Sequence, residues 1–326
     1  MTQQQIPREF FNCLPFWKDD MASMEHPVFS LSTQPERRNL HYENNGNTIK
    51  IIPSSLGLPT INDKDILIFC MSHLRAAITQ GEVPNRTVRF TIYDFFKEIN
   101  RDKGGRSYKE FQDSLRRLKG VVIETSIKTG RFRIVEGFGL IDSWRVVQED
   151  STGRVIAVEI KLSEWLYNSI VSNELLTINP DYFQLRKPIE RRLYEIARKH
   201  CGNQKVFKIG LAKLQLKIGS GSELREFRRA IRAIVEDNHL PDYLIALSDD
   251  DDNVTFTNRL TQIAAIQQTD FIQLKPDTYE KIRVACPGCA LQELEQQWRD
   301  WVATKKELPK RPDAAFIAFC RKKHNP

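Results

Sequence analysis

The hydrophobic and polar positions of this chain follow one pattern twice, about 120 residues apart. Each copy begins with an apolar stretch and continues into a short helical run. After a glycine-containing turn it ends in a longer amphipathic run rich in basic residues. The spacing is kept inside these elements and differs only at the turn, which predicts one small module used twice. Its order is that of a helix-turn-helix followed by a hairpin.

The repeat is carried by eight pairs of apolar positions. Before the turn the offset is 119 residues, and it pairs Phe90, Ile92, Phe95 and Ile99 with Ile209, Leu211, Leu214 and Ile218. After the turn the offset is 116 residues, and it pairs Tyr108, Phe111, Leu115 and Leu118 with Leu224, Phe227, Ile231 and Ile234.

The remaining pattern predicts the elements around each copy. A helix is expected over about 62–79, capped by Asn62 or Asp63 and stopped by Gly81, and a second from Pro188 to about 200. Alternation predicts strands over 121–128, 131–147 and 154–162, then a hairpin over 241–248 and 253–258. Ser163 is expected to cap a short helix, and the chain turns helical again from about 273, with Asp313 capping the last helix.

These elements predict an α+β fold with two winged-helix domains in tandem and a helical C-terminal segment. We place an N-terminal extension at 1–58, the first winged-helix domain at 59–180 and the second at 181–265. The helical segment is placed at 266–326.

The second amphipathic run has two distinct faces when it is placed on a helix at about 100° per residue. The core side carries Leu224, Phe227, Ile231, Ile234 and Val235. A neighbouring stripe carries Arg225, Arg228, Arg229 and Arg232. Four arginines on one stripe repel one another, and DNA phosphates and base edges would supply the missing acceptors. The alternative is a solvated basic face, but the position of a recognition helix favours DNA binding.

The first copy is less basic at the equivalent positions. They are Lys109, Gln112, Asp113 and Arg116, and Asp113 dilutes the positive stripe. We add Arg106, just before this helix, to the candidate DNA contacts, and expect backbone or protein contact here rather than base reading. The hairpin that follows carries Lys128, Arg131 and Arg133 at its turn, as expected of a basic wing. An edge hairpin kept soluble by charge is the alternative.

Composition agrees with an anionic partner without requiring one. The 326 residues carry 49 Lys and Arg against 42 Asp and Glu, a formal charge of +7, with a pI near 9.0. No apolar run is long enough to cross a membrane, and the first residues do not resemble a secretory signal. Six cysteines without a framework spacing favour a reduced, cytoplasmic protein, with Cys70 a buried thiol.

Recognisable catalytic and cofactor chemistry is missing from the sequence. There is no phosphate-binding loop of the G-x-x-x-x-G-K-[ST] type. The six histidines include no close pair of the kind used by nicking enzymes. Cys286 and Cys289 form a C-x-x-C that only Cys320 and His324 could complete as a zinc site, so a Pro-Gly turn is the better interpretation. We therefore expect no enzyme activity, no metal and no cofactor.

Long segments of the chain closely resemble the replication initiator protein A family of bacterial plasmids. The resemblance extends over nearly the whole chain, from about Leu14 to the C-terminal helix. It is carried by residues 14–29, 62–74, 86–96, 136–144, 162–168, 181–202, 224–232 and 312–323. The Cys286–Cys289 pair departs from the pattern of that family.

The resemblance implies an initiator with two winged-helix domains that binds repeated sites at a plasmid origin. It implies that the protein helps to open adjacent DNA, brings in the host initiator DnaA and the replicative helicase, and represses its own promoter, often as a homodimer. It also implies that the second winged helix reads the repeat, which makes Arg225, Arg228, Arg229 and Arg232 the candidates for specificity. The alternatives are a winged-helix repressor without initiator activity, a nicking endonuclease, and an adaptor that binds no DNA.

Overall fold

The computed structural model describes most of the chain between residues 16 and 324. The described ranges are 16–32, 35–44, 47–102, 104–129, 132–148, 155–248, 250, 252–261, 274–285, 291–303, 309 and 311–324.

The first repeated unit consists of a helix, a strand, two helices and a returning hairpin. Its elements are α2 (Lys64–Thr79), β4 (Thr87–Phe90), α3 (Ile92–Glu98), α4 (Gly105–Gly120), β7 (Ile141–Gln148) and β8 (Val155–Leu162). The three strands form an antiparallel sheet in the order β4-β8-β7. The short helix α5 (Glu164–Val171) follows, and the Oγ of Ser163 accepts a hydrogen bond from the Leu166 amide as expected of its cap.

The second unit repeats this order and this topology. Its elements are α6 (Pro188–His200), β10 (Val206–Gly210), α7 (Leu211–Ile218), α8 (Leu224–Asp237), β11 (Tyr243–Leu247) and β12 (Asn253–Asn258). The sheet order is β10-β12-β11, so in both units the first strand pairs with the last. The predicted helix from Pro188 to 200 is confirmed, and the repeat extends from the sequence to the strand order.

Burial supports the alignment of the two copies. Fourteen of the sixteen paired apolar residues are buried in the core, the exceptions being Tyr108 and Leu224. Leu224, which we expected on the core side, is 36% exposed because it is the first residue of α8. Phe111 and Phe227, one turn further along each long helix, are almost fully buried and anchor their helices at matching points.

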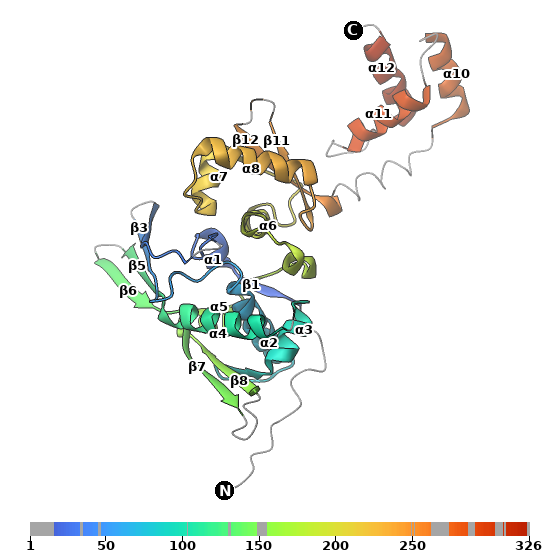
Figure 1. Ribbon diagram of the computed structural model, residues 1–326. Coiled ribbons are helices and arrows are strands. Elements are labelled where there is room, and N and C mark those ends of the chain that lie inside the picture. Colours follow the sequence, from blue (N-terminus) through green and yellow to red (C-terminus); the bar gives the residue numbers. More distant parts are fainter. Residues whose placement is uncertain are drawn as a thin grey trace.

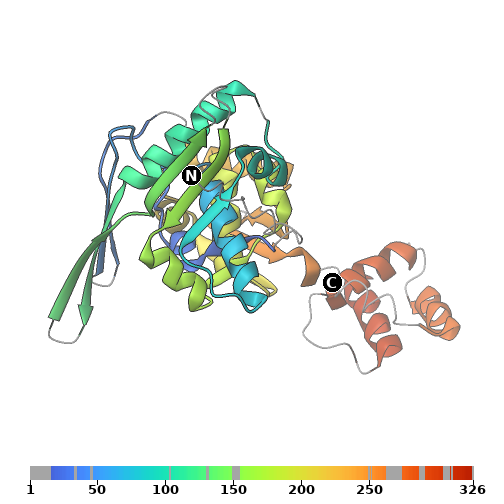
Figure 2. The same ribbon diagram turned by 90° about the horizontal axis from the view of Figure 1, so that it is seen from below.

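The predicted basic wing of the first unit is wrong, because another hairpin occupies that position. The hairpin of β5 (Val122–Thr129) and β6 (Phe132–Phe138) pairs with the N-terminal hairpin of β2 (Leu40–Asn44) and β3 (Asn47–Ile52). Together they form a separate sheet in the order β2-β3-β5-β6, which projects from the rest of the unit in Figure 2. The counterpart of the β11–β12 hairpin is β7–β8, since β8 pairs with β4 as β12 pairs with β10.

Residues before the first unit join the two units. Strand β1 (Lys18–Asp20) pairs with β9 (Leu175–Thr177), and α1 (Met21–Glu25) packs against α6. One continuous hydrophobic core runs from Trp17 to Phe256 and includes both units. In Figure 1, α1 and β1 lie between the helices of the first unit and α6 to α8 of the second. A 3₁₀ turn, η1 (Pro180–Gln184), leads into α6.

The last three helices have a small core of their own. They are α10 (Pro276–Ala285), α11 (Leu291–Ala303) and α12 (Pro312–His324), and Ile282, Trp298 and Phe316 pack between them. Trp298 is fully buried, whereas Trp301 is 45% exposed. Asp313 lies inside α12 rather than before it, and its carboxylate accepts hydrogen bonds from the Lys275 amide and Thr278 at the start of α10. It therefore ties α10 to α12.

Candidate nucleic-acid interface

The two ends of α8 are fixed by the local sequence. Helix α7 ends at Gly219, whose φ of 78° is in the left-handed region and whose place against Pro27 leaves no room for a Cβ. Asn238 ends α8 with φ 43°, and its side chain accepts a hydrogen bond of 3.1 Å from the Ile245 amide. The inner side of the helix, led by Phe227 and Ile231, is buried in the core. Its orientation is therefore set by packing, and the arginine stripe must face away from the core.

The four arginines of α8 do not share one environment. Arg225, Arg229 and Arg232 are exposed, and Arg229 has only a loose ion pair with Glu226, at 3.7 Å. The side chain of Arg228 is 27% exposed, and a terminal nitrogen lies 3.3 Å from Oδ1 of Asp252 on the β11–β12 hairpin. Three of the four arginines are thus exposed, and the fourth is held against the hairpin.

On α4 the equivalent basic groups are paired along the helix. Arg106 lies 2.9 Å from Glu110, and Arg116 lies 2.6 Å from Asp113. Lys109 is exposed and Gln112 is partly buried. Because Glu110 and Asp113 offset both arginines, the outer face of α4 carries less net positive charge than that of α8.

The inner side of α4 is bound to α2 by polar groups. The Asp63 carboxylate accepts hydrogen bonds from Nε and a terminal nitrogen of Arg117, at 2.7 and 2.8 Å, and from Ser114 Oγ at 2.6 Å. The hydrogen bond to Asp63 raises the pKa of Arg117 above its usual value. Asp63 occupies the predicted cap position of α2, but its side chain makes no cap hydrogen bond to that helix. The prediction was right about the position and wrong about what the carboxylate does.

The remaining predicted contacts lie near the turn between β5 and β6. Lys128 and Arg133 are opposite one another on β5 and β6, in the hairpin that pairs with β3, and Arg131 lies outside the described residues. On the second hairpin Asp250 and Asp252 are described, and both carry carboxylates where DNA phosphates would be repelled. The second hairpin is therefore unsuited to lie along the DNA backbone.

A buried network of charged groups lies where the N-terminal segment, α2 and α6 meet. Lys64 Nζ is 2.6 Å from Asp19 Oδ2 and 3.0 Å from Glu195 Oε1, and all three side chains are essentially inaccessible to solvent. Tyr182 donates a hydrogen bond of 2.8 Å to Glu195. Arg192 pairs with the second oxygen of Glu195 at 2.8 Å. Buried charges persist only when they are paired and hydrogen-bonded in this way.

This network reaches the turn before the candidate reading helix. Arg192 donates hydrogen bonds to the carbonyl oxygens of Ser23 in α1 and Lys217 at the end of α7, at 2.8 and 3.0 Å. A second buried pair joins Arg191 of α6 to Asp65 of α2 at 2.6 Å. Side chains of α6 therefore connect the first unit to the start of the α7–α8 turn.

The network also shifts the pKa values of its carboxyl groups and its amine. Burial raises the pKa of Asp19 to about 8, although Lys64 opposes the shift. Burial also disfavours the charged forms of Lys64 and Glu195. Their partners outweigh that effect, so the pKa of Lys64 is raised and that of Glu195 is lowered. Lys64 and Glu195 are therefore a stable ion pair at neutral pH.

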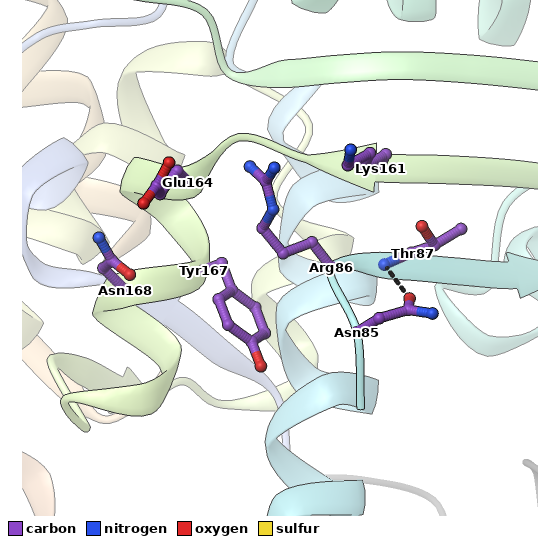
Figure 3. Close-up of a pocket in the computed structure, with 7 residues that line it drawn as sticks. All are labelled: Asn85, Arg86, Thr87, Lys161, Glu164, Tyr167 and Asn168. Carbon is purple, nitrogen blue, oxygen red and sulfur yellow. Dashed lines mark hydrogen bonds between the residues drawn. The ribbon is translucent and has the colours of Figure 1, made fainter. Parts of the chain in front are cut away.

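A pocket of about 560 Å³ opens between β4, β8 and α5, lined by Asn85, Arg86, Thr87, Lys161, Glu164, Tyr167 and Asn168 (Figure 3). Its cations are offset by carboxylates, because Arg86 pairs with Asp142 at 2.8 Å and Glu164 lies on the lining. This mixed charge does not resemble a phosphate site.

Within the described part of the chain no cluster of three or more His, Cys, Asp or Glu could hold a metal, and Cys286 and Cys289 lie outside that part. Cys70 is buried as expected. None of the helices in the described ranges is long and apolar enough to cross a membrane.

The sequence places this chain in a family of replication initiators, and its fold is similar to that of a solved structure. The mixed α+β fold is similar to a crystal structure of domains 2 and 3 of RctB, with a TM-score of 0.55 at 14% identity. That match covers 73% of this chain and 98% of the other. The family model of replication initiator protein A matches residues 18–245. A protein of Wigglesworthia glossinidia brevipalpis named "Putative replication protein" is 44% identical over 246 residues, which is 74% of this chain and 89% of that protein. The chain belongs to the replication initiator protein A family.

Proposed function

We propose that this protein starts plasmid replication by binding repeated duplex sites at the origin through two winged-helix units. Membership of the initiator family supports the replication role. The observation that carries DNA binding is the outer face of α8, where Arg225, Arg229 and Arg232 are exposed while Phe227 and Ile231 fix the helix from within. A rigid helix with guanidinium groups on its free side suits the major groove, where arginine pairs with guanine.

The two units have different roles in this proposal. Helix α8 reads bases, because its stripe carries no acidic member and three of its four arginines are exposed. Helix α4, whose arginines are paired with Glu110 and Asp113, contacts the DNA backbone or a second copy of the protein. Opening of adjacent DNA and recruitment of the host initiator DnaA and the replicative helicase complete the proposed function. The same proposal includes repression of its own promoter by a homodimer. It also includes association of the protein with plasmid DNA in the cytoplasm.

Footprinting of the purified protein on the replicon that encodes it tests this function. We expect protection of several directly repeated sites beside AT-rich DNA, with protection falling steeply as salt rises because phosphate contacts release counterions. One inverted repeat over a promoter and no protected repeats would instead indicate a repressor. Absence of any protected site at low salt would contradict DNA binding by this chain.

A further inference from the structure

Arg228 differs from the other members of the arginine stripe in a way that its sequence position does not explain. Its side chain is 27% exposed, while that of Arg229, the next residue on the same face, is 80% exposed. Its Nε is buried and has no hydrogen-bond partner, and one terminal nitrogen contacts Asp252. Only the terminal nitrogens of this guanidinium remain accessible to an acceptor that approaches from solvent.

The backbone of the residue that contacts Arg228 is held in place from both sides. The carbonyl oxygen of Asp252 accepts a hydrogen bond of 2.8 Å from the Leu211 amide, the first residue of α7. Its own amide donates a hydrogen bond of 3.2 Å to Asp250 Oδ1. Asp252 then leads into β12, where Asn253 pairs with Gly210. The Asp252 backbone is thus fixed to the start of α7, although its side chain is 69% exposed.

We propose that Asp252 is a positioning residue that holds the Arg228 guanidinium in one orientation for a base edge of duplex DNA, so that it increases sequence discrimination while it weakens attachment to DNA in general. The proposal rests on the proposed function of α8. An arginine side chain has many rotamers, and freezing them before binding lowers the entropic cost of a directed contact. A negative charge beside the interface also repels phosphates at every sequence.

The two effects of the carboxylate have opposite signs, which makes the proposal testable. A carboxylate that only repelled phosphates would lower affinity for all duplexes by the same factor. A carboxylate that only blocked Arg228 would lower affinity for the specific site most of all. Only positioning of Arg228 together with repulsion of phosphates predicts that loss of the carboxylate raises affinity for random duplex and lowers the ratio of specific to random affinity.

The experiment compares binding of Asp252→Ala and wild type to the selected site and to a random duplex of equal length. We expect random-duplex affinity to rise about two- to threefold and the specificity ratio to fall about tenfold, the size of one arginine–base contact. Asp252→Asn keeps an acceptor oxygen and should lose less of the ratio. Glu226→Ala is the matched control, because it removes one carboxylate that lies 3.7 Å from Arg229, beyond hydrogen-bonding distance. It should raise both affinities equally.

The Arg228→Ala background provides the second arm. If Asp252 acts through Arg228, Asp252→Ala should leave the specificity ratio unchanged once the arginine is absent. An unchanged or increased ratio in the single Asp252→Ala variant would overturn the proposal, as would an equal loss of ratio in both backgrounds. Failure of the proposed function has a different signature, because wild type would then show no preference for any selected site.

Discussion

Helices α4 and α8 occupy the same place in the two units, and they differ in how charge is distributed around them. Each is anchored by a buried phenylalanine, Phe111 or Phe227, at matching positions. On α4 a polar side chain is also used inward, since Arg117 binds Asp63, whereas its aligned residue on α8 is the exposed Ala233. The outer faces differ as well. On α4 the outer arginines are paired with carboxylates of the same helix, whereas on α8 most of the outer arginines are exposed.

This contrast indicates how one module can serve two purposes. A helix that uses its ionic groups for attachment and internal pairing is well fixed but offers little net charge to DNA. A helix held by apolar contacts keeps its cations for a ligand. The difference arises from few positions, such as Asp113 against Arg229, so it can be tested by substitution.

The largest expected effect concerns the junction that holds both helices on one body. Lys64→Ala leaves Asp19 and Glu195 buried without their shared cation, and removal of one partner from such a pair costs about 3–5 kcal/mol. Denaturant unfolding measures the loss. Arg106→Ala removes an exposed cation from α4 and should change stability by less than about 1 kcal/mol. Equal effects of the two variants would contradict the buried network.

Substituting the outer faces compares the helices directly. We expect Arg225→Ala combined with Arg229→Ala and Arg232→Ala to weaken specific binding by about a hundredfold or more, at about 1–3 kcal/mol for each base contact. The α4 set, Arg106→Ala with Lys109→Ala and Arg116→Ala, should weaken specific and random binding alike, by about tenfold or less. Equilibrium titration of both duplexes measures this, and a larger specific loss from the α4 set would reverse the assignment.

A single substitution should make α4 more like α8. Asp113→Arg restores the missing member of the stripe and frees Arg116 from its partner at 2.6 Å. We expect random-duplex affinity to rise a few-fold. The slope of log affinity against log salt concentration should become steeper by about one unit, as for one additional phosphate contact. Asp181→Arg, at an exposed position on η1, makes the same charge change elsewhere. A gain of equal size from that control would mean that net charge, rather than the face of α4, is responsible.

The shared junction should also show a pH dependence. The pKa of Asp19 is raised to about 8 from an ordinary 3.8, so between these values the folded protein retains a proton that the unfolded chain has released. Its contribution to stability is complete below about pH 4 and is lost as pH rises to about 8. Asp19→Asn should flatten this part of the stability curve, measured by unfolding from pH 5 to 8. A variant with the wild-type slope would contradict the raised pKa.

The repeated units could be predicted because their signal is local. Helix periodicity and turn residues specify α2, α6 and α8 within one or two residues, and the two copies support each other. Partner choice in the β5–β6 hairpin could not be predicted, because β5 pairs with a strand about 75 residues earlier (Ile51 with Ile123) and alternation does not encode the partner. We therefore took the hairpin that carries Lys128 and Arg133 for the wing, although β7–β8 occupies that position.

The charged junction was missed for a related reason. Charged residues in an amphipathic helix are normally assigned to solvent, yet in α6 Glu190, Arg191, Arg192 and Glu195 are all buried. The helical pattern gave no signal of this, because most of the charged residues of α6 fall on one side, as they do on a helix that faces solvent. The outward stripe of α8 was predicted, but the contact between Arg228 and Asp252 depends on how the hairpin folds back, and sequence spacing does not show it.

Selection of bound sequences from a pool of random duplexes tests whether α8 reads the sequence, with wild type, Arg229→Ala and Lys109→Ala compared side by side. We expect Arg229→Ala to lose base preference at one or two positions of the selected motif, and Lys109→Ala to retain the whole motif and bind it more weakly. An unchanged motif in the Arg229→Ala selection, or an altered one in the Lys109→Ala selection, would contradict the assignment of sequence reading to α8.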